Sequence, residues 1–296
     1  MGVEAYRTPD ERFLGLPGWP YEPHYMEQDG LRLHYVDEGD GAPILLLHGE
    51  PTWGFLYRKL IPRLAGAGRV VVPDYFGFGR SDKPLEHAWY SYDRHFAAVE
   101  RLVCEQLDLR DATVVVQDWG GPIGLRLAVE HRERIEHLVI MNTGIGARAP
   151  GEAWLRFQAF VRRLGTDIEP GRLVQLSCVT ELSDGVVAGY EAPFPTPESK
   201  AGVLMFPELV ATGSEHPSAA AMIAVREALR SWEKPALVLF SDSDPIFTTE
   251  HAERMAALIP GAGPLQTVAG AAHFLQEDRG EEIAERIAAW LASAAG

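Results

Sequence analysis

Cysteine and basic residues are scarce in this chain of 296 residues. It contains two cysteines, Cys104 and Cys178, which are too few for a disulfide framework and indicate buried thiols in a reducing compartment. Its 27 Lys and Arg residues stand against 42 Asp and Glu residues, which gives a formal net charge of −15. Nucleic acids and anionic membranes bind to basic surfaces, so this charge argues against both as partners. It also mildly disfavours anionic substrates in solution.

Long apolar runs are missing as well. No stretch approaches the length that a membrane-spanning helix needs, and residues 1–10 lack the basic-then-apolar pattern of a secretory signal. We therefore expect a cytoplasmic protein with no membrane as partner. The hydrophobic share of 46% is ample for a core, and the length suits one large α/β unit with an inserted piece. We expect this unit to be a monomer.

Short apolar runs alternate with stretches of helical spacing along most of the chain. A hairpin is predicted over residues 24–38, around Asp29-Gly30. Further strands are predicted at residues 44–48, 70–73, 112–117, 137–142, 235–241 and 264–269. Helices are predicted at residues 55–64, 95–107, 122–131 and 277–292. This alternation predicts an α/β fold with a mostly parallel sheet that is flanked by helices on both faces.

The alternation stops between about Gly144 and Trp232. This segment has no strand-like run, and its helical pieces are separated by Pro150, Pro170, Pro193, Pro195, Pro197 and Pro217. We interpret it as a helical cap inserted over the carboxyl ends of the strands. The expected division is a core of residues 1–144 and 232–296 and a cap of residues 145–231.

Asp118 has the most informative surroundings in the chain. It follows the β-branched run Val114-Val115-Val116-Gln117 and precedes Trp119-Gly120-Gly121 and a helical pattern. A strand, a sharp turn and a helix form the context of a nucleophile elbow, although the glycine usual two places before the nucleophile is Val116 here. The exposed residue is a carboxylate, which needs no base for activation. Its attack on carbon would leave an ester on the enzyme.

Hydrolysis of such an ester requires a base and an acid that orients it. His273 follows a strand-like run and a small turn, which is where α/β enzymes carry their sites, so it is either the base or a structural histidine. For the orienting acid, Asn142 cannot carry a negative charge, whereas Asp242 and Asp244 follow the strand at 235–241. Local pattern leaves the choice between these two acids open, since either could cap a turn.

The turn His48-Gly49-Glu50-Pro51 directly follows the predicted strand at 44–48. Such a turn can offer the backbone N–H of Glu50 to an oxyanion, with the backbone N–H of Trp119 as partner. The alternative is an ordinary turn at the end of a strand.

Together these segments resemble the haloalkane dehalogenase family of the α/β-hydrolase superfamily, and in particular the subgroup with an Asp-Trp elbow. The segments that carry the resemblance are His48-Gly49-Glu50-Pro51-Thr52-Trp53, Pro73-Asp74-Tyr75-Phe76-Gly77-Phe78-Gly79-Arg80-Ser81-Asp82-Lys83-Pro84, Gln117-Asp118-Trp119-Gly120-Gly121, Ala192-Pro193-Phe194-Pro195, Ser241-Asp242-Ser243-Asp244-Pro245 and Gly270-Ala271-Ala272-His273-Phe274. They span the chain from about Phe13 to the last helix.

The resemblance implies a hydrolase that cleaves carbon–halogen bonds to give an alcohol, halide and a proton. It implies Asp118 as nucleophile, His273 as base and Asp244, rather than Asp242, as the acid that orients it. The implied partners are a small apolar halogenated substrate, halide ion and water, with no cofactor and no metal. The backbone N–H groups of Glu50 and Trp119 would form the oxyanion hole.

A departing halide needs desolvated donors, and an indole N–H donates without a lone pair that would repel the anion. Trp119 suits this role. The family subgroup usually adds a second indole from the first cap helix, and the corresponding candidates here are Trp154 or Phe157. By the same resemblance Trp53 and Phe76 would line an apolar pocket, or they belong to the core.

Two other functions stay open at this point. An epoxide hydrolase shares the nucleophile and the fold, but its poor leaving group calls for phenols in the cap, and Tyr190 is the only tyrosine between Gly144 and Trp232. The second alternative is a non-catalytic, ligand-binding member of the fold.

Overall fold

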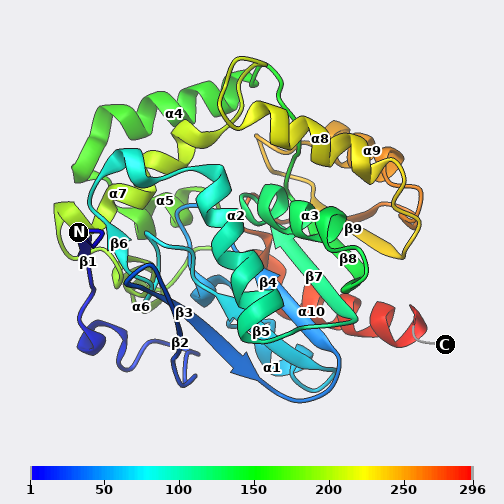
Figure 1. Cartoon of the computed structure of the whole chain (residues 1–296), viewed down its shortest axis with the longest axis horizontal. Helices are drawn as coiled ribbons and strands as arrows, with labels where there is room; N and C mark the ends of the chain where they lie inside the picture. The colour runs from blue at the N-terminus through cyan, green and yellow to red at the C-terminus, as the bar shows by residue number, and fades with distance from the viewer. Residues whose placement is uncertain (1, 295–296) are drawn as a thin grey trace.

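The computed structural model describes residues 2–294 and contains one large sheet with helices on both faces (Figure 1). The strand order is β10-β9-β8-β7-β4-β5-β3-β2. The strands are β2 (His24–Gln28), β3 (Leu31–Glu38), β4 (Pro43–Leu47), β5 (Arg69–Pro73), β7 (Ala112–Gln117), β8 (Ile135–Met141), β9 (Ala236–Ser241) and β10 (Gln266–Val268). Strands β4, β5, β7, β8, β9 and β10 pair in parallel, whereas β3 is antiparallel to both β2 and β5. The predicted α/β fold with a mostly parallel sheet is confirmed.

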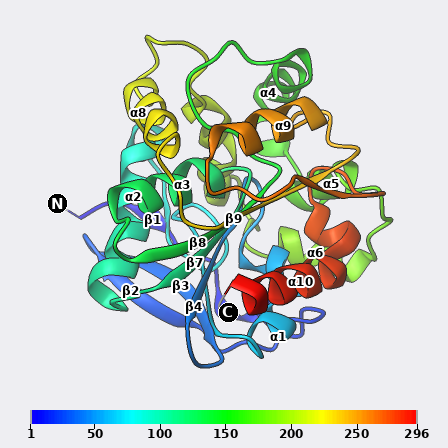
Figure 2. The ribbon, with the colours of Figure 1, turned by 90° about the vertical axis from the view of Figure 1, so that its right-hand side faces the viewer.

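Two groups of helices cover the sheet (Figure 2). Helices α2 (Tyr92–Arg101) and α3 (Gly120–Glu130) lie on one face, and α1 (Ile61–Leu64) and α10 (Leu275–Ala294) lie on the other. The central strands β7 and β9 are buried along their whole length, which explains their continuous apolar sequence. A separate two-stranded sheet pairs β1 (Ala5–Tyr6) with β6 (Lys83–Pro84).

Between β8 and β9 the described chain is helical and contains no strand. It holds α4 (Glu152–Leu164), α5 (Pro170–Leu176), α6 (Asp184–Glu191), α7 (Ala201–Met205) and α8 (Ala219–Leu229). Helix α9 (Thr249–Leu258) then follows β9. Proline at the first turns of α5 and of α1 suits those positions, where a backbone N–H has no partner within the helix.

The prediction of one continuous helix over residues 55–64 is wrong. The structure has a 3₁₀ turn at Gly54–Tyr57 and the short α1 at Ile61–Leu64 instead. Every residue of the 3₁₀ turn is buried, so tertiary packing decides its backbone. The predicted strand at 264–269 is also shorter, since only Gln266–Val268 pair with β9.

Parallel pairing brings three loops to one edge of the sheet. In the register, Leu47 of β4 lies beside Val116 of β7, and Gln117 of β7 lies beside Met141 of β8. Glu50, Asp118 and Asn142 follow β4, β7 and β8. These three residues therefore meet at the carboxyl ends of the strands. This is the edge where parallel α/β sheets carry ligand sites.

Candidate active site

Asp118 occupies a strained turn between β7 and α3. Its φ of +48° lies in the left-handed region, which few residues other than glycine adopt. The neighbouring loop holds this backbone, because Thr143 Oγ1 donates to the Asp118 carbonyl at 2.6 Å and Asp118 N donates to the Asn142 carbonyl at 3.0 Å. A Cβ at position 49 would overlap the Asp118 side chain, so glycine is needed there. The turn has the geometry of a nucleophile elbow.

His273 lies between two carboxylates. Its Nδ1 is 2.8 Å from Asp244 Oδ2, and its Nε2 is 3.7 Å from Asp118 Oδ2. The Asp244 side chain has no exposed surface and also accepts the backbone N–H groups of Ile246 and Phe247 at 2.7 and 3.0 Å. These contacts favour the tautomer in which Nδ1–H donates to Asp244 and the lone pair of Nε2 faces Asp118.

Burial and charge oppose each other at these groups. Burial lowers the pKa of His273, but Asp244 and Asp118 together raise it by more, so this pKa lies above its ordinary value of 6.5. Burial raises the pKa of Asp244, whereas His273 and two backbone N–H groups lower it by more. Burial also raises the pKa of Asp118 above 3.8, against the lowering effects of His273 and of two backbone N–H groups. The arrangement favours an ionised Asp244 beside an imidazole of raised basicity.

Two backbone donors meet the Asp118 carboxylate. Glu50 N donates to Asp118 Oδ1 at 2.9 Å, and the N–H of Trp119 also bonds to this carboxylate. His48 holds the turn that presents Glu50, because its Nδ1 bonds to the Gly49 carbonyl at 2.9 Å. Burial lowers the pKa of His48 to about 4, so this imidazole is neutral and structural. The donors are already in place for negative charge on this carboxylate.

The Glu50 side chain is 6% exposed, and its Oε1 has no hydrogen-bond partner among the described residues. Burial and the nearby Asp118 charge raise the pKa of Glu50 well above its ordinary value. This environment favours neutral Glu50, which leaves Asp118 as the charged carboxylate of the pair.

Three polar side chains that the sequence analysis gave no role form hydrogen bonds that hold the loops of the site together. Gln117 Nε2 donates to the His273 carbonyl at 3.2 Å and lies 3.3 Å from His273 Nε2. Asn142 Nδ2 donates to Ser241 Oγ at 2.8 Å and to the His273 carbonyl at 3.2 Å. Asp242 accepts the Gly270 N–H, so it orders the turn before His273. A buried polar residue at the end of a strand is the signal that could have identified Gln117 and Asn142.

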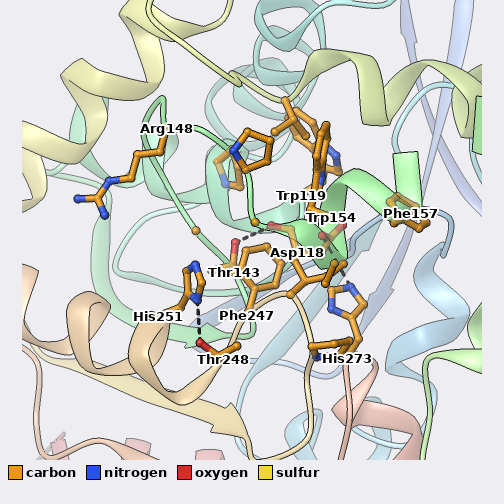
Figure 3. A pocket seen from close by; sticks show the side chains of 18 of the residues that line it. Asp118, Trp119, Thr143, Arg148, Trp154, Phe157, Phe247, Thr248, His251 and His273 are labelled. Atoms are coloured by element: carbon orange, nitrogen blue, oxygen red, sulfur yellow. Dashed lines mark hydrogen bonds and ion pairs between the residues drawn. The ribbon is translucent and has the colours of Figure 1, made fainter. Parts of the chain in front are cut away.

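Asp118 opens into a cavity of about 840 Å³ between the strand ends and the helices that follow β8 (Figure 3). Trp119, Trp154 and Phe157 line it together with His273. No residue that the structure describes accepts a hydrogen bond from the indole N–H of Trp119 or Trp154. The cavity therefore combines an apolar wall with two unused donors.

Trp53 and Phe76 belong to the core rather than to the cavity wall. Trp53 is fully buried and donates its indole N–H to the Gly189 carbonyl at 3.1 Å. Phe76 is 1% exposed and packs edge-to-face on Trp89. The sequence left open whether these two aromatic residues line the pocket or belong to the core, and in the structure they belong to the core.

Across residues 2–294, no group of three or more His, Cys, Asp or Glu side chains is arranged to hold a metal ion. None of the helices in the same range combines the length and the apolar character needed to cross a bilayer.

The fold and the site define an α/β hydrolase. Residues 42–180 match the family model of the alpha/beta hydrolase fold, a segment that contains Glu50, Asp118 and Trp119.

Closer relatives narrow the class. A haloalkane dehalogenase from Mycobacterium marinum is 46% identical over 97% of this chain and 100% of its own length, and one from Psychrobacter cryohalolentis is 43% identical over 98% of each. Among solved structures, the tetrameric haloalkane dehalogenase DpaA from Paraglaciecola agarilytica superposes with a TM-score of 0.90 at 35% identity, covering 96% of this chain and 97% of that one. The chain belongs to the haloalkane dehalogenase family, and it is a hydrolase that acts on carbon–halide bonds.

Proposed function

We propose that Asp118 is the nucleophile of a two-step dehalogenation. One carboxylate oxygen attacks the carbon that bears the halogen, a C–O bond forms as the carbon–halogen bond breaks, and the halide leaves with both electrons. The observation that carries this proposal is the position of Asp118 in the cavity, with Glu50 N–H on one oxygen and His273 Nε2 3.7 Å from the other. The product is an alkyl ester on the enzyme.

His273 then serves as the base that removes this ester. It takes a proton from water, whose oxygen attacks the Asp118 carboxyl carbon. The N–H groups of Glu50 and Trp119 stabilise the resulting oxyanion, and its collapse releases the alcohol and restores the carboxylate. Asp244 orients the imidazole and stabilises the imidazolium, which finally loses its proton to solvent. The hydrogen bond of 2.8 Å between His273 and Asp244 supports this role.

We propose that the indoles of Trp119 and Trp154 hold the halide. Both line the cavity beside Asp118, and both N–H groups lack an acceptor among the described residues. Phe157 lines the same cavity but has no donor to offer.

A halide titration tests this choice. Since a hydrogen bond to a charged group contributes about 1.5–3 kcal/mol, we expect Trp154→Phe to weaken bromide binding roughly tenfold or more. Quenching of tryptophan fluorescence or product inhibition by bromide measures the effect. The matched variant Phe157→Leu should bind bromide as the wild type does. Weaker binding in Phe157→Leu, with no loss in Trp154→Phe, would assign the contact to Phe157.

The arrangement of segments supports two further parts of the proposal. We propose that residues 145–231 form a cap and residues 1–144 and 232–296 the hydrolase core, where residues 1, 295 and 296 lie outside the described ones. The described chain between β8 and β9 holds helices α4 to α8 and no strand, which supports this division. We also propose the Asp-Trp subgroup with Asp244 as its late acid, and a cytoplasmic monomer whose site is complete within one chain. Cys104 and Cys178, which form no disulfide, fit a reducing compartment.

Opening an epoxide would require an acid for the leaving oxygen, and the position of Tyr190 disfavours this alternative. Tyr190 is fully buried and its hydroxyl donates to Glu277, so it is not available at the cavity. Halide is a weak base and leaves without a proton. The site therefore suits carbon–halogen bonds better than epoxides.

Release of bromide from 1,2-dibromoethane tests the proposed function, with styrene oxide as the competing substrate. We expect repeated turnover on the dibromide and little diol from the epoxide. Diol formation at the faster rate would favour the epoxide hydrolase, and ligand binding without turnover of either would favour the non-catalytic alternative.

The same assay has a defined pH dependence. Ester hydrolysis needs neutral His273, and Asp244 raises the pKa of His273 against the opposing effect of burial. The smaller effect of Asp118 is absent at this step, because an esterified carboxylate carries no charge. Turnover is therefore lost as the pH falls through that raised pKa and is complete above it. Turnover that stays complete at acid pH, with no such limb, would contradict His273 as the base.

A further inference from the structure

Three arginines line one side of the cavity, although the chain as a whole carries a net charge of −15. Arg148 comes from the loop after β8, Arg226 from α8 and Arg254 from α9, and all three line the same cavity as Asp118. We call these three side chains the arginine rim. Figure 3 shows Arg148 and His251 on the same side of the pocket.

The charge of the rim is only partly neutralised. No described residue forms an ion pair with the Arg148 guanidinium. Arg226 and Arg230 share a single carboxylate, that of Glu227, at 3.3 and 2.8 Å. The rim can therefore accept a further negative group.

The acidic side chains of the cavity wall are already engaged. Glu152 pairs with Arg156 at 3.1 Å, and Glu250 pairs with Arg254 one helical turn away. Glu50 is in surroundings that favour its neutral form. The pair with Glu250 also neutralises Arg254, so the excess positive charge on this side rests on Arg148 and on Arg226, which shares one carboxylate with Arg230.

An aromatic ring connects the rim side to the reacting atoms. The Phe247 ring stacks on His273 with centroids 5.8 Å apart, and it contacts the His251 ring edge-to-face at 6.2 Å. Burial lowers the pKa of His251, and the charges of Arg254 and Arg148 lower it further, whereas those of Glu250 and Asp244 oppose this effect. The His251 ring therefore lies close to charges of both signs. An alkyl chain along Phe247 would therefore reach from the nucleophile toward the rim.

Building on the proposed function, we propose that the arginine rim binds a carboxylate at the far end of the substrate, and that the preferred substrates are ω-halocarboxylates. The rim would hold the anionic end while the halogen-bearing carbon lies against Asp118. One water and one ω-bromocarboxylate give an ω-hydroxycarboxylate, bromide and a proton through the same aspartyl ester. Arg148 and Arg254 are exposed and Arg226 is half-buried, so solvent and salt weaken this attraction, and a modest effect on substrate binding is expected.

Paired substrates separate this inference from the proposed function. We compare kcat/KM for 8-bromooctanoate and for its neutral methyl ester in the wild type, Arg148→Gln and Arg148→Gln/Arg226→Gln. We expect the wild type to prefer the acid and Arg148→Gln to lose about three- to tenfold in kcat/KM on the acid alone, through KM. The double variant should lose more. Arg110→Gln removes the same charge at an exposed position before β7 and serves as control.

A charge reversal sharpens the comparison. In Arg148→Glu the preference should invert, so that (8-bromooctyl)trimethylammonium becomes a better substrate than it is for the wild type. An equal loss on acid and ester in Arg148→Gln would point to a role in halide exit and would overturn the inference. An unchanged ratio of acid to ester would overturn it as well.

Calorimetry with octanoate gives a readout that does not depend on turnover. Weaker binding of octanoate to Arg148→Gln than to the wild type and Arg110→Gln supports the rim even if no bromide is released. Equal affinities overturn it. If the wild type released bromide from neither 8-bromooctanoate nor its methyl ester, the proposed function itself would be contradicted.

Discussion

His273→Phe should convert the enzyme into one that alkylates itself once and then stops. Asp118 needs no base for its attack, so 1,2-dibromoethane should still form the ester, whereas no group remains to activate water. We expect one bromoethyl group on the peptide that contains Asp118, and a loss of multiple turnover of about 10³-fold or more. Intact-protein and peptide mass spectrometry measure the adduct. Bromide release should fall to one equivalent per enzyme.

Phenylalanine suits position 273 because the imidazole already packs between the rings of Phe247 and Phe274. His95→Phe is the matched control, because His95 is also buried among aromatic rings and neither of its ring nitrogens has a partner among the described residues. This variant should turn over repeatedly and carry no adduct. An unmodified Asp118 peptide in His273→Phe, under conditions where the substrate binds, would rule out the covalent route through Asp118.

Glu277→Ala should destabilise the protein strongly. Glu277 is 1% exposed and binds the guanidinium of Arg58 through both of its carboxylate oxygens, and one of them also accepts the hydroxyl of Tyr190. Removing the carboxylate leaves the Arg58 charge buried and unpaired, which costs about 3–5 kcal/mol of the free energy of unfolding. Urea denaturation followed by circular dichroism measures this difference.

An exposed ion pair provides the comparison. Arg63 and Glu285 are 45% and 64% exposed and lie 2.8 Å apart, so Glu285→Ala should change the free energy of unfolding by less than about 1 kcal/mol. The double variant Arg58→Met/Glu277→Leu should recover much of the loss, because it removes both buried charges. A loss below about 1 kcal/mol for Glu277→Ala would mean that solvent reaches Arg58 when its partner is gone.

Local pattern was sufficient for most of the sheet. Strands β7 and β9 are buried throughout, so their apolar runs stand out without any knowledge of their neighbours. The hairpin between β2 and β3 was predictable for a similar reason, since the backbone at Asp29-Gly30 has the positive φ that its turn requires. The 3₁₀ turn at Gly54–Tyr57 was not predictable, because its backbone depends on burial against distant segments.

The candidate site divides in the same way. A strand, a tight turn and a helix around Asp118 are contiguous in sequence, so the elbow could be predicted. The acid for His273 could not be chosen from local pattern, since Asp242 and Asp244 lie in one loop. In the fold Asp242 turns to Gly270 and Asp244 to His273. Gln117 and Asn142 bond to the backbone of the His273 loop, which lies far along the chain.

The order of residues alone was enough to indicate a carboxylate at an elbow, the sheet beneath it and the type of ester chemistry, because these depend on neighbours along the chain. The charge inside the cavity depended on folding. Total composition is strongly acidic, yet Arg148, Arg226 and Arg254 come from three separate segments and meet at one wall. The packing of the helices over the strand ends decides which side chains come together. Amino-acid composition does not contain this information.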